Sequence, residues 1–137
     1  KISVDKQARK VWVKEVYGKK GLNTSEIYQK NKAECGLDLI ICDNSEPRLI
    51  NELKVLGMNI KPTIKKKGSI LSGIALMQDY EIIVDRNSHG IIREINNYAW
   101  KDKGEVPMDK FNHFIDAIRY AMMYLIQGKN SGVYVIR

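Results

Sequence analysis

The sequence predicts an α/β domain built on a mixed β-sheet. Two short stretches of apolar alternation at the start of the chain indicate a pair of antiparallel strands. Short apolar runs then alternate with segments of helical periodicity, an order that is typical of parallel strands joined by helices. The chain has 137 residues, 44% of them hydrophobic, which is enough to bury a core.

Residues 1–18 are predicted to form a β-hairpin. After a polar turn, Val11 and Val13 alternate with polar neighbours in the second strand. A helix over residues 24–34 is expected next, because capping side chains precede it and Gly36 follows its end.

A strand, a helix and a second strand are predicted in the middle of the chain. The apolar run at 38–43 is bounded by polar residues, which is typical of a buried parallel strand. Pro47 suits the first turn of a helix that Gly57 ends. Residues 58–64 form the next strand, and Pro62 restricts that strand to an edge of the sheet.

The second half continues the alternation and ends with the most apolar helix. The expected elements are a helix over 69–78, a strand over 81–85, a helix capped by Ser88, a loop over 101–108, a helix over 110–126 and a strand over 131–137. The first of these helices is predicted to bury an apolar face made of Ile70, Leu71, Ile74 and Met77.

The composition favours a polyanionic partner and excludes several classes of protein. The net charge is +7 at a pI of about 9.4, which suits nucleic acid. No apolar run approaches the roughly 18 residues of a membrane span, and no signal peptide opens the chain. Cys35 and Cys42 are too few for a disulfide framework or a zinc signature, which favours a reducing cytoplasm.

Two acids and a histidine are candidates for a metal site. Asp43 ends an apolar strand, where the loops of α/β sheets open a crevice. Asp116 lies within the most apolar helix, and His113 shares its face. A carboxylate there needs a cation or a donor, and Mg²⁺ or Mn²⁺ prefer oxygen ligands. Two such ions about 4 Å apart can hydrolyse a phosphodiester.

Each candidate also has a structural interpretation. Asp43 suits a turn or a helix cap. Asp116 is within reach of Arg119 or Lys110 along its helix. His113 suits a structural role, so the spacing alone indicates a metal nuclease only faintly.

The densest basic cluster comprises Lys65, Lys66 and Lys67, with Lys61 before it. It is expected in a loop that leads into a helix, where backbone N–H groups also favour phosphate. The functional interpretation is sequence-independent contact with a DNA backbone. The alternative is a solvated loop.

Several linked motifs resemble the nuclease domain of phage large terminase subunits. Segment 41–47, followed by a helix that ends at Gly57, resembles the second acidic motif of that family. Segment 112–121, which contains His113 and Asp116, resembles the third. Further matches occur in family order at 66–70, 73–74, 92–95 and 97–101, so that the resemblance spans about residues 35 to 125.

The resemblance implies an RNase H-like fold, a central mixed sheet flanked by helices on both faces. It implies a metal-dependent endonuclease of the two-metal type that cuts concatemeric double-stranded DNA during packaging. Asp43, Asp116 and His113 would be the catalytic metal-binding residues, with Mg²⁺ or Mn²⁺ as cofactor. Lys61 and the loop at 65–67 would lie near the DNA.

The same resemblance implies an N-terminal ATPase domain, a portal and a small terminase subunit as partners, with no membrane. The cytoplasm of an infected bacterium, or of a host carrying a prophage, would be the location. The expected organisation is one nuclease domain over 1–137, with the hairpin at 1–18, an α/β core at 36–126 and a C-terminal extension at 127–137.

The first acidic motif of the family has no match in this chain. Asp5 is the one candidate, but a turn acid suits that position. Because Lys1 is not a methionine, we expect the motif and its strand upstream of Lys1. The domain would then be N-terminally incomplete and, with one metal-binding carboxylate missing, a weak or inactive nuclease. The gap left in the sheet would be filled either by the upstream residues or by another strand, such as one at 133–136.

Two other functions stay open at this point. Another RNase H-like nuclease, of the resolvase or transposase type, would use similar acids. A non-catalytic DNA-binding module would need the lysines but neither Asp43 nor Asp116.

Overall fold

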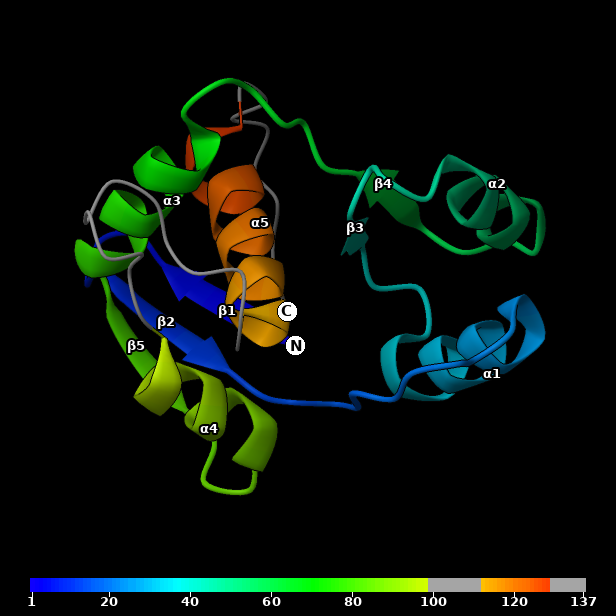
Figure 1. The fold of residues 1–137 in the computed structure, drawn as a ribbon, viewed down its shortest axis with the longest axis horizontal. Helices are drawn as coiled ribbons and strands as arrows, with labels where there is room; N and C mark the ends of the chain where they lie inside the picture. Colours follow the sequence, from blue (N-terminus) through cyan, green and yellow to red (C-terminus); the bar gives the residue numbers. More distant parts are fainter. Residues whose placement is uncertain (99–111, 129–137) are drawn as a thin grey trace. The chain divides into compact units, whose positions relative to one another are not determined.

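The computed structural model describes residues 1–98 and 112–128, and these carry five strands and five helices (Figure 1). The chain divides into two units. Unit 1 consists of Lys1–Val16 and Lys67–Arg137, and unit 2 consists of Tyr17–Lys66. Both units contain strands and helices, so the predicted α/β class is confirmed.

The sheet of unit 1 is mixed, as predicted. Strands β1 (Ile2–Asp5) and β2 (Lys10–Val13) form the expected antiparallel hairpin, and β5 (Glu81–Val84) pairs with β2 in parallel. The hairpin turn follows from its own residues. Asp5 Oδ1 accepts a 2.8 Å hydrogen bond from the N–H of Ala8, and Arg9 has a φ of +52°. Asp5 therefore has the turn role that its position suggested.

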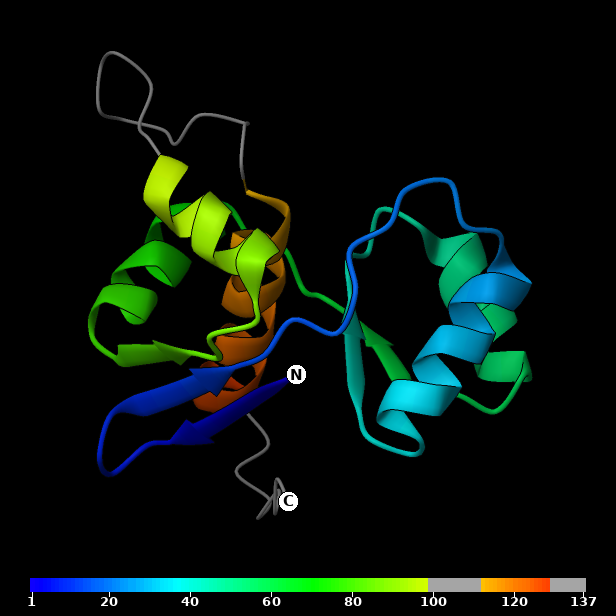
Figure 2. The ribbon, with the colours of Figure 1, turned by 90° about the horizontal axis from the view of Figure 1, so that it is seen from below.

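Three helices cover one face of this sheet: α3 (Ser69–Gln78), α4 (His89–Asn97) and α5 (His113–Gln127) (Figure 2). Alternation along β2 buries Val11 and Val13 on that face, while Trp12 points to the other face and is 43% exposed. The core is completed by Leu76, Ile91, Ile118 and Met122, which come from all three helices.

The buried face of α3 differs from the predicted one. Ile74 is buried as expected, but Ile70 and Leu71 are 45% and 49% exposed, so the prediction was wrong for these two. The helix packs on α5 through Gly73, where a Cβ would lie 2.6 Å from Cγ of Arg119. This close approach turns the first apolar pair of α3 towards solvent.

Unit 2 has two parallel strands and two helices. Strand β3 (Ile40–Cys42) pairs with β4 (Ile60–Pro62), and the helices are α1 (Thr24–Cys35) and α2 (Pro47–Val55). Its core consists of Ile50, Leu53, Met58 and Ile60. The predicted caps are confirmed: Asn23 and Glu26 form a capping box, and Gly36 ends α1 at a φ of +57°.

The described strands form two sheets, ordered β1-β2-β5 and β3-β4, where the resemblance implied one central sheet. Within the described residues, the strands of each unit pair among themselves: β2 pairs with β1 and β5, and β3 pairs with β4. The loop predicted at 101–108, the strand predicted at 131–137, and Lys110 and Phe111 of the last predicted helix lie outside the described residues. None of the described helices combines the length and the apolar character that crossing a bilayer requires.

Candidate functional site

Asp43 follows β3 directly, at the carboxyl end of a parallel strand, as predicted. Its Oδ1 lies 2.7 Å from Nζ of Lys65 and also accepts a 2.9 Å hydrogen bond from the N–H of Ser45. A second contact holds the loop that carries Asp43, because the hydroxyl of Thr63 accepts a hydrogen bond from the N–H of Asn44. Asp43 thus combines the turn role with an ion pair.

The surroundings of Asp43 favour its ionised form. Partial burial alone would raise the pKa of this carboxyl, but the hydrogen bond and charge of Lys65 and the bonds from Ser45 outweigh it. The pKa of Asp43 is therefore lowered from its ordinary value. The side chain is 40% exposed, so a cation from solvent can reach it while it carries a negative charge.

Asp116 lies in the first turn of α5 and pairs with Arg119. The guanidinium Nη2 of Arg119 lies 2.9 Å from Oδ1 of Asp116, across one turn of the helix. Arg119 was one of the two partners that the spacing suggested; the other, Lys110, lies outside the described residues. The Asp116 side chain is 32% exposed, whereas that of Arg119 is 4% exposed.

Arg119 is held on several sides. Its stem packs on Gly73 of α3, and its guanidinium lies 4.7 Å from the centre of the Tyr120 ring. Among the described residues, its Nε is a buried donor without a hydrogen-bond partner. The pKa of the neighbouring Tyr98 phenol is raised, first by burial and then by the charge of Asp116. The charge of Arg119 opposes this shift.

His113 is the first residue of α5 and is exposed. It lies one turn before Asp116, so the two side chains share a helix face as predicted. Asp43 belongs to unit 2, whereas His113 and Asp116 belong to unit 1. Within the described ranges, no group of three His, Cys, Asp or Glu side chains gathers closely enough to hold a metal ion.

Glu94 of α4 also acts on the first turn of α5, and sequence reasoning assigned it no role. Its Oε2 accepts hydrogen bonds from the N–H of Phe114 at 2.6 Å and from that of Ile115 at 3.0 Å. Glu94 is 7% exposed, and its carboxylate satisfies amides that a helix N-terminus leaves without intrahelical partners. The sequence feature that could have indicated this role was an acidic residue within an amphipathic helix.

Glu15 performs the same function for α4. Its Oε2 accepts the N–H of Gly90 at 2.7 Å and the N–H of Ile91 at 3.2 Å. Ser88, the predicted cap, occupies the N-cap position, but its hydroxyl instead accepts the N–H of Glu15 at 2.9 Å. The backbone and side chain of Glu15 thus both bind the start of α4.

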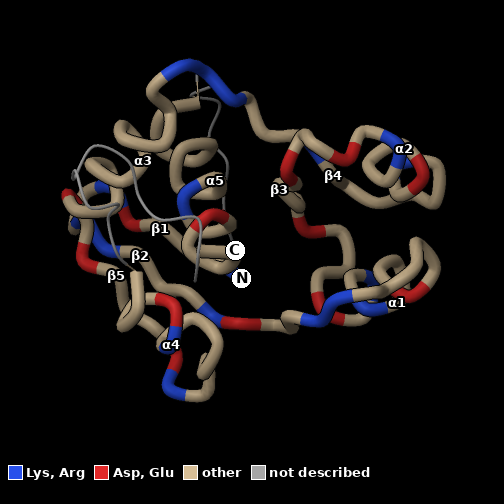
Figure 3. Tube along the Cα trace, in the orientation of Figure 1, with Lys and Arg blue, Asp and Glu red and all other residues tan. Residues whose placement is uncertain are grey.

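The four candidate DNA-binding lysines lie in and after β4. Lys61 is an exposed residue of the strand, and Lys65, Lys66 and Lys67 occupy the loop before α3. Figure 3 shows this run as a blue stretch of the tube between β4 and α3. Lys65 differs from its neighbours because it binds Asp43.

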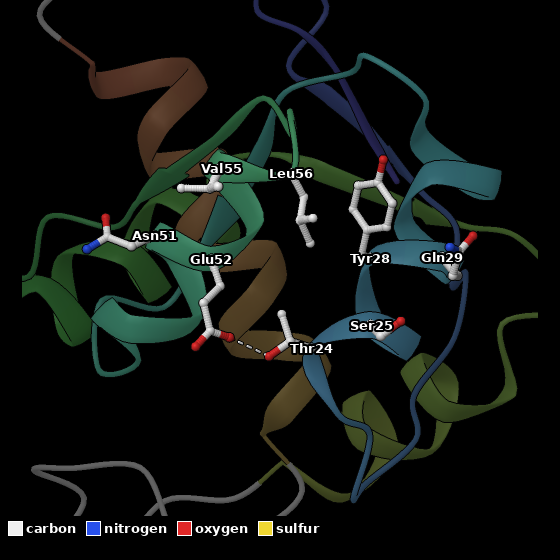
Figure 4. Close-up of a pocket in the computed structure, with 8 residues that line it drawn as sticks. All are labelled: Thr24, Ser25, Tyr28, Gln29, Asn51, Glu52, Val55 and Leu56. Carbon is white, nitrogen blue, oxygen red and sulfur yellow. Dashed lines mark hydrogen bonds between the residues drawn. The ribbon is translucent and has the colours of Figure 1, made fainter.

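A groove of about 650 Å³ runs between α1 and α2 in unit 2 (Figure 4). At one end, the hydroxyl of Thr24 donates a 2.6 Å hydrogen bond to Oε2 of Glu52. The lining residues are Thr24, Ser25, Tyr28, Gln29, Asn51, Glu52, Val55 and Leu56. None of the candidate metal-binding or DNA-binding residues is among them.

The donor chemistry of Asp43 and Asp116 fits Mg²⁺ or Mn²⁺. Both side chains offer carboxylate oxygens, which these ions prefer, and both are partly exposed. Each carboxylate already binds a cationic side chain, which shows that its surroundings accommodate positive charge. Neither Cys35 nor Cys42 forms a disulfide.

Known proteins resemble this chain along most of its length. The family model for the terminase RNase H-like domain matches residues 1–123. The large terminase subunit of Bacillus phage SPP1 is 37% identical over 107 residues, which are 72% of this chain and 25% of that protein. This chain thus spans about a quarter of the length of that relative.

A solved structure of a terminase domain also resembles this chain. The crystal structure of the large terminase nuclease domain from bacteriophage SPP1 with bound Mn aligns with a TM-score of 0.73. The sequence identity is 31%, and the alignment covers 91% of this chain and 76% of that chain. The α/β RNase H-like fold implied by the motifs is thereby confirmed. With the family model matching most of its length, this chain belongs to the terminase RNase H-like domain family.

Proposed function

We propose that this chain is the nuclease domain of a DNA-packaging terminase and that it hydrolyses double-stranded DNA with a divalent metal ion. The observation that carries the proposal is the alignment of 91% of the chain with a nuclease domain that binds Mn. The acids at the end of β3 and in the first turn of α5 give this similarity a chemical basis within the chain.

Asp43, Asp116 and His113 are the proposed metal-binding residues. Lys65 lowers the pKa of Asp43 and orients its carboxylate, and Arg119 orients the carboxylate of Asp116. Metal binding would exchange part of each of these ion pairs for an ion–carboxylate contact. His113 adds an exposed imidazole next to Asp116 on the same helix.

Two bound Mg²⁺ or Mn²⁺ ions would activate the attacking water and stabilise the leaving oxygen. The contribution of the chain is to supply carboxylates whose rotation is restricted by hydrogen bonds, one of which, Asp43, also has a lowered pKa. The hydrogen bonds from Ser45 and Lys65 restrict Asp43, and the bond from Arg119 restricts Asp116.

The lysines after β4 are proposed to bind the phosphate backbone of the substrate. Lys61, Lys65, Lys66 and Lys67 lie within a short stretch of a chain whose net charge is +7. Contacts of this kind are independent of base sequence and depend strongly on salt. We further propose that an ATPase domain, a portal and a small terminase subunit are partners, in the cytoplasm of an infected bacterium.

A plasmid-nicking assay with Mn²⁺ or Mg²⁺ tests the proposal on the protein that carries this chain. Asp43→Asn and Asp116→Asn keep the side-chain shape but remove the charge, so each is expected to abolish cleavage and to leave DNA binding largely intact. Chelation of the metal with EDTA should have the same effect. Asp38→Asn and Asp79→Asn are matched controls in turn positions and should cleave normally.

The outcome also separates the alternative functions. Unchanged cleavage by either substituted protein would refute the metal-binding role of that acid. A strong preference for branched DNA over plain duplex would indicate a resolvase instead. DNA binding without cleavage at any metal concentration would indicate a non-catalytic binding module.

A further inference from the structure

The first turn of α5 is contacted by two buried charged side chains. Taken as whole residues, Glu94 is 7% exposed and Arg119 is 3% exposed, and no other charged residue is buried in the part of the chain that the structure describes. One acts on the backbone of the turn and the other on the carboxylate of Asp116. This coincidence calls for an explanation, because charged groups are rarely buried.

Glu94 fixes the backbone. It reaches from α4 to α5, and a single oxygen, Oε2, accepts the N–H groups of both Phe114 and Ile115. These amides lie in the turn that carries His113 and Asp116. Because the two bonds converge on one atom, a shift of the turn would lengthen at least one of them.

Arg119 fixes the side chain. Its Nη2 binds Oδ1 of Asp116, while its stem lies against Gly73 and its guanidinium over the ring of Tyr120. Contacts on the stem and on the planar group leave the guanidinium little freedom. Its direction therefore determines where the carboxylate of Asp116 points.

Capping alone does not require a buried charge. At the start of α1, Asn23 and Glu26 cap the helix by local bonds in an exposed position. Placing a carboxylate and a guanidinium out of water is unfavourable unless both are well bonded. The arrangement around α5 is therefore better explained by a need to hold the first turn of this helix in a fixed geometry.

We propose that Glu94 and Arg119 are positioning residues that hold Asp116 in the geometry needed for metal binding. The inference rests on the proposed function, since it assumes that Asp116 is a metal ligand. Residues that orient ligands commonly alter metal affinity by about 10–100-fold when they are replaced. The same magnitude is expected for these two positions.

Glu15 provides a matched control. It binds two amides at the start of α4 through one carboxylate oxygen, with the same chemistry as Glu94 one helix further from Asp116. Glu15→Gln and Glu94→Gln should destabilise the fold to a similar degree. Only Glu94→Gln should disturb the turn that carries Asp116.

The test measures Mn²⁺ affinity by electron paramagnetic resonance of free Mn²⁺, together with the melting temperature, on the protein that carries this chain. Glu94→Gln is expected to weaken Mn²⁺ binding by about tenfold or more, and Glu15→Gln by less than about twofold. Arg119→Lys, which keeps the charge, should retain more affinity than Arg119→Met. Equal losses for Glu94→Gln and Glu15→Gln, or no loss for Glu94→Gln, would overturn the positioning role.

Failure of the proposed function gives a different result. In that case the unsubstituted protein would not bind Mn²⁺ at all, or Asp116→Asn would bind Mn²⁺ as tightly as the unsubstituted protein. Either result would refute the inference together with the proposed function. If Glu94→Gln does not fold, the pair Arg119→Lys and Arg119→Met decides the question alone. Equal affinity in that pair would then refute the inference.

Discussion

Nζ of Lys65 lies 2.7 Å from Oδ1 of Asp43, so one lysine of the basic loop is bound to a proposed metal ligand. The pair joins two motifs that the sequence suggested separately, an acid after a strand and a basic cluster. It also distinguishes Lys65 from Lys66 and Lys67, which are exposed in the same loop. The functional consequences of replacing these lysines should therefore differ.

Lys65→Ala is expected to raise the pKa of Asp43, because partial burial would then act with less opposition. The pKa is lowered in the folded state, so the pair stabilises the fold above the unfolded-state value, about 3.9 for Asp. That stabilisation is lost as the pH falls through the lower, folded-state pKa. With the side chains 42% and 40% exposed, solvent screens the pair, and it contributes less than about 1 kcal/mol.

A carbon-13 NMR titration of the Asp43 carboxyl measures this pKa directly. Urea unfolding at pH 7 should show the small loss of stability for Lys65→Ala. Lys66→Ala is the control and should leave both quantities unchanged. An equal effect of the two substitutions would show that general positive charge, and not the ion pair, sets the pKa.

Lys66 and Lys67 are expected to act on DNA affinity alone. Each phosphate contact that is lost should reduce the slope of log K against log salt by about 0.9. The double substitution to Ala should therefore weaken binding to all duplex sequences alike. It should also reduce the slope of log K against log salt by the amount that corresponds to about two phosphate contacts. Fluorescence anisotropy over a salt series measures both effects, with Lys54→Ala of α2 as control. A loss confined to particular sequences would contradict backbone binding.

Local features of the fold were predictable from sequence. The capping box at Asn23 and the start of α2 at Pro47 depend on neighbours within one helical turn. Asp43 at a strand end and the pairing of Asp116 with Arg119 depend on short spacings in the same way. The family motifs then supplied the chemistry that these spacings indicated only faintly.

The long-range contacts were not predictable. Glu15 caps α4 from 75 residues away, and Glu94 caps α5 from 20 residues away. No periodicity in one sequence reports such distances. The exposed Ile70 and Leu71 show the same limit, because the face that α3 buries depends on the approach of Arg119 to Gly73.

Gly73→Ala is expected to destabilise unit 1. The added Cβ would lie 2.6 Å from Cγ and 2.7 Å from Cδ of Arg119, and 2.8 Å from the sulfur of Met123. Overpacking of this kind costs about 1–3 kcal/mol, while the higher helix propensity of Ala returns up to about 1 kcal/mol. Urea unfolding should show a net loss, whereas Ser72→Ala, exposed on the same helix, should not. A stability gain for Gly73→Ala would mean that α3 and α5 separate easily.

Leu53→Ala tests the core of unit 2. Leu53 is 1% exposed and packs with Ile50, Met58 and Ile60, so its removal leaves a cavity that neighbouring backbone cannot readily fill. The expected loss is about 2–5 kcal/mol of unfolding free energy. Val55 is on the same helix but 88% exposed, and Val55→Ala should change stability by less than about 0.5 kcal/mol. Circular dichroism during urea unfolding compares the two proteins. Similar stabilities would contradict the assignment of this core, because only a buried side chain loses its contacts when it is shortened.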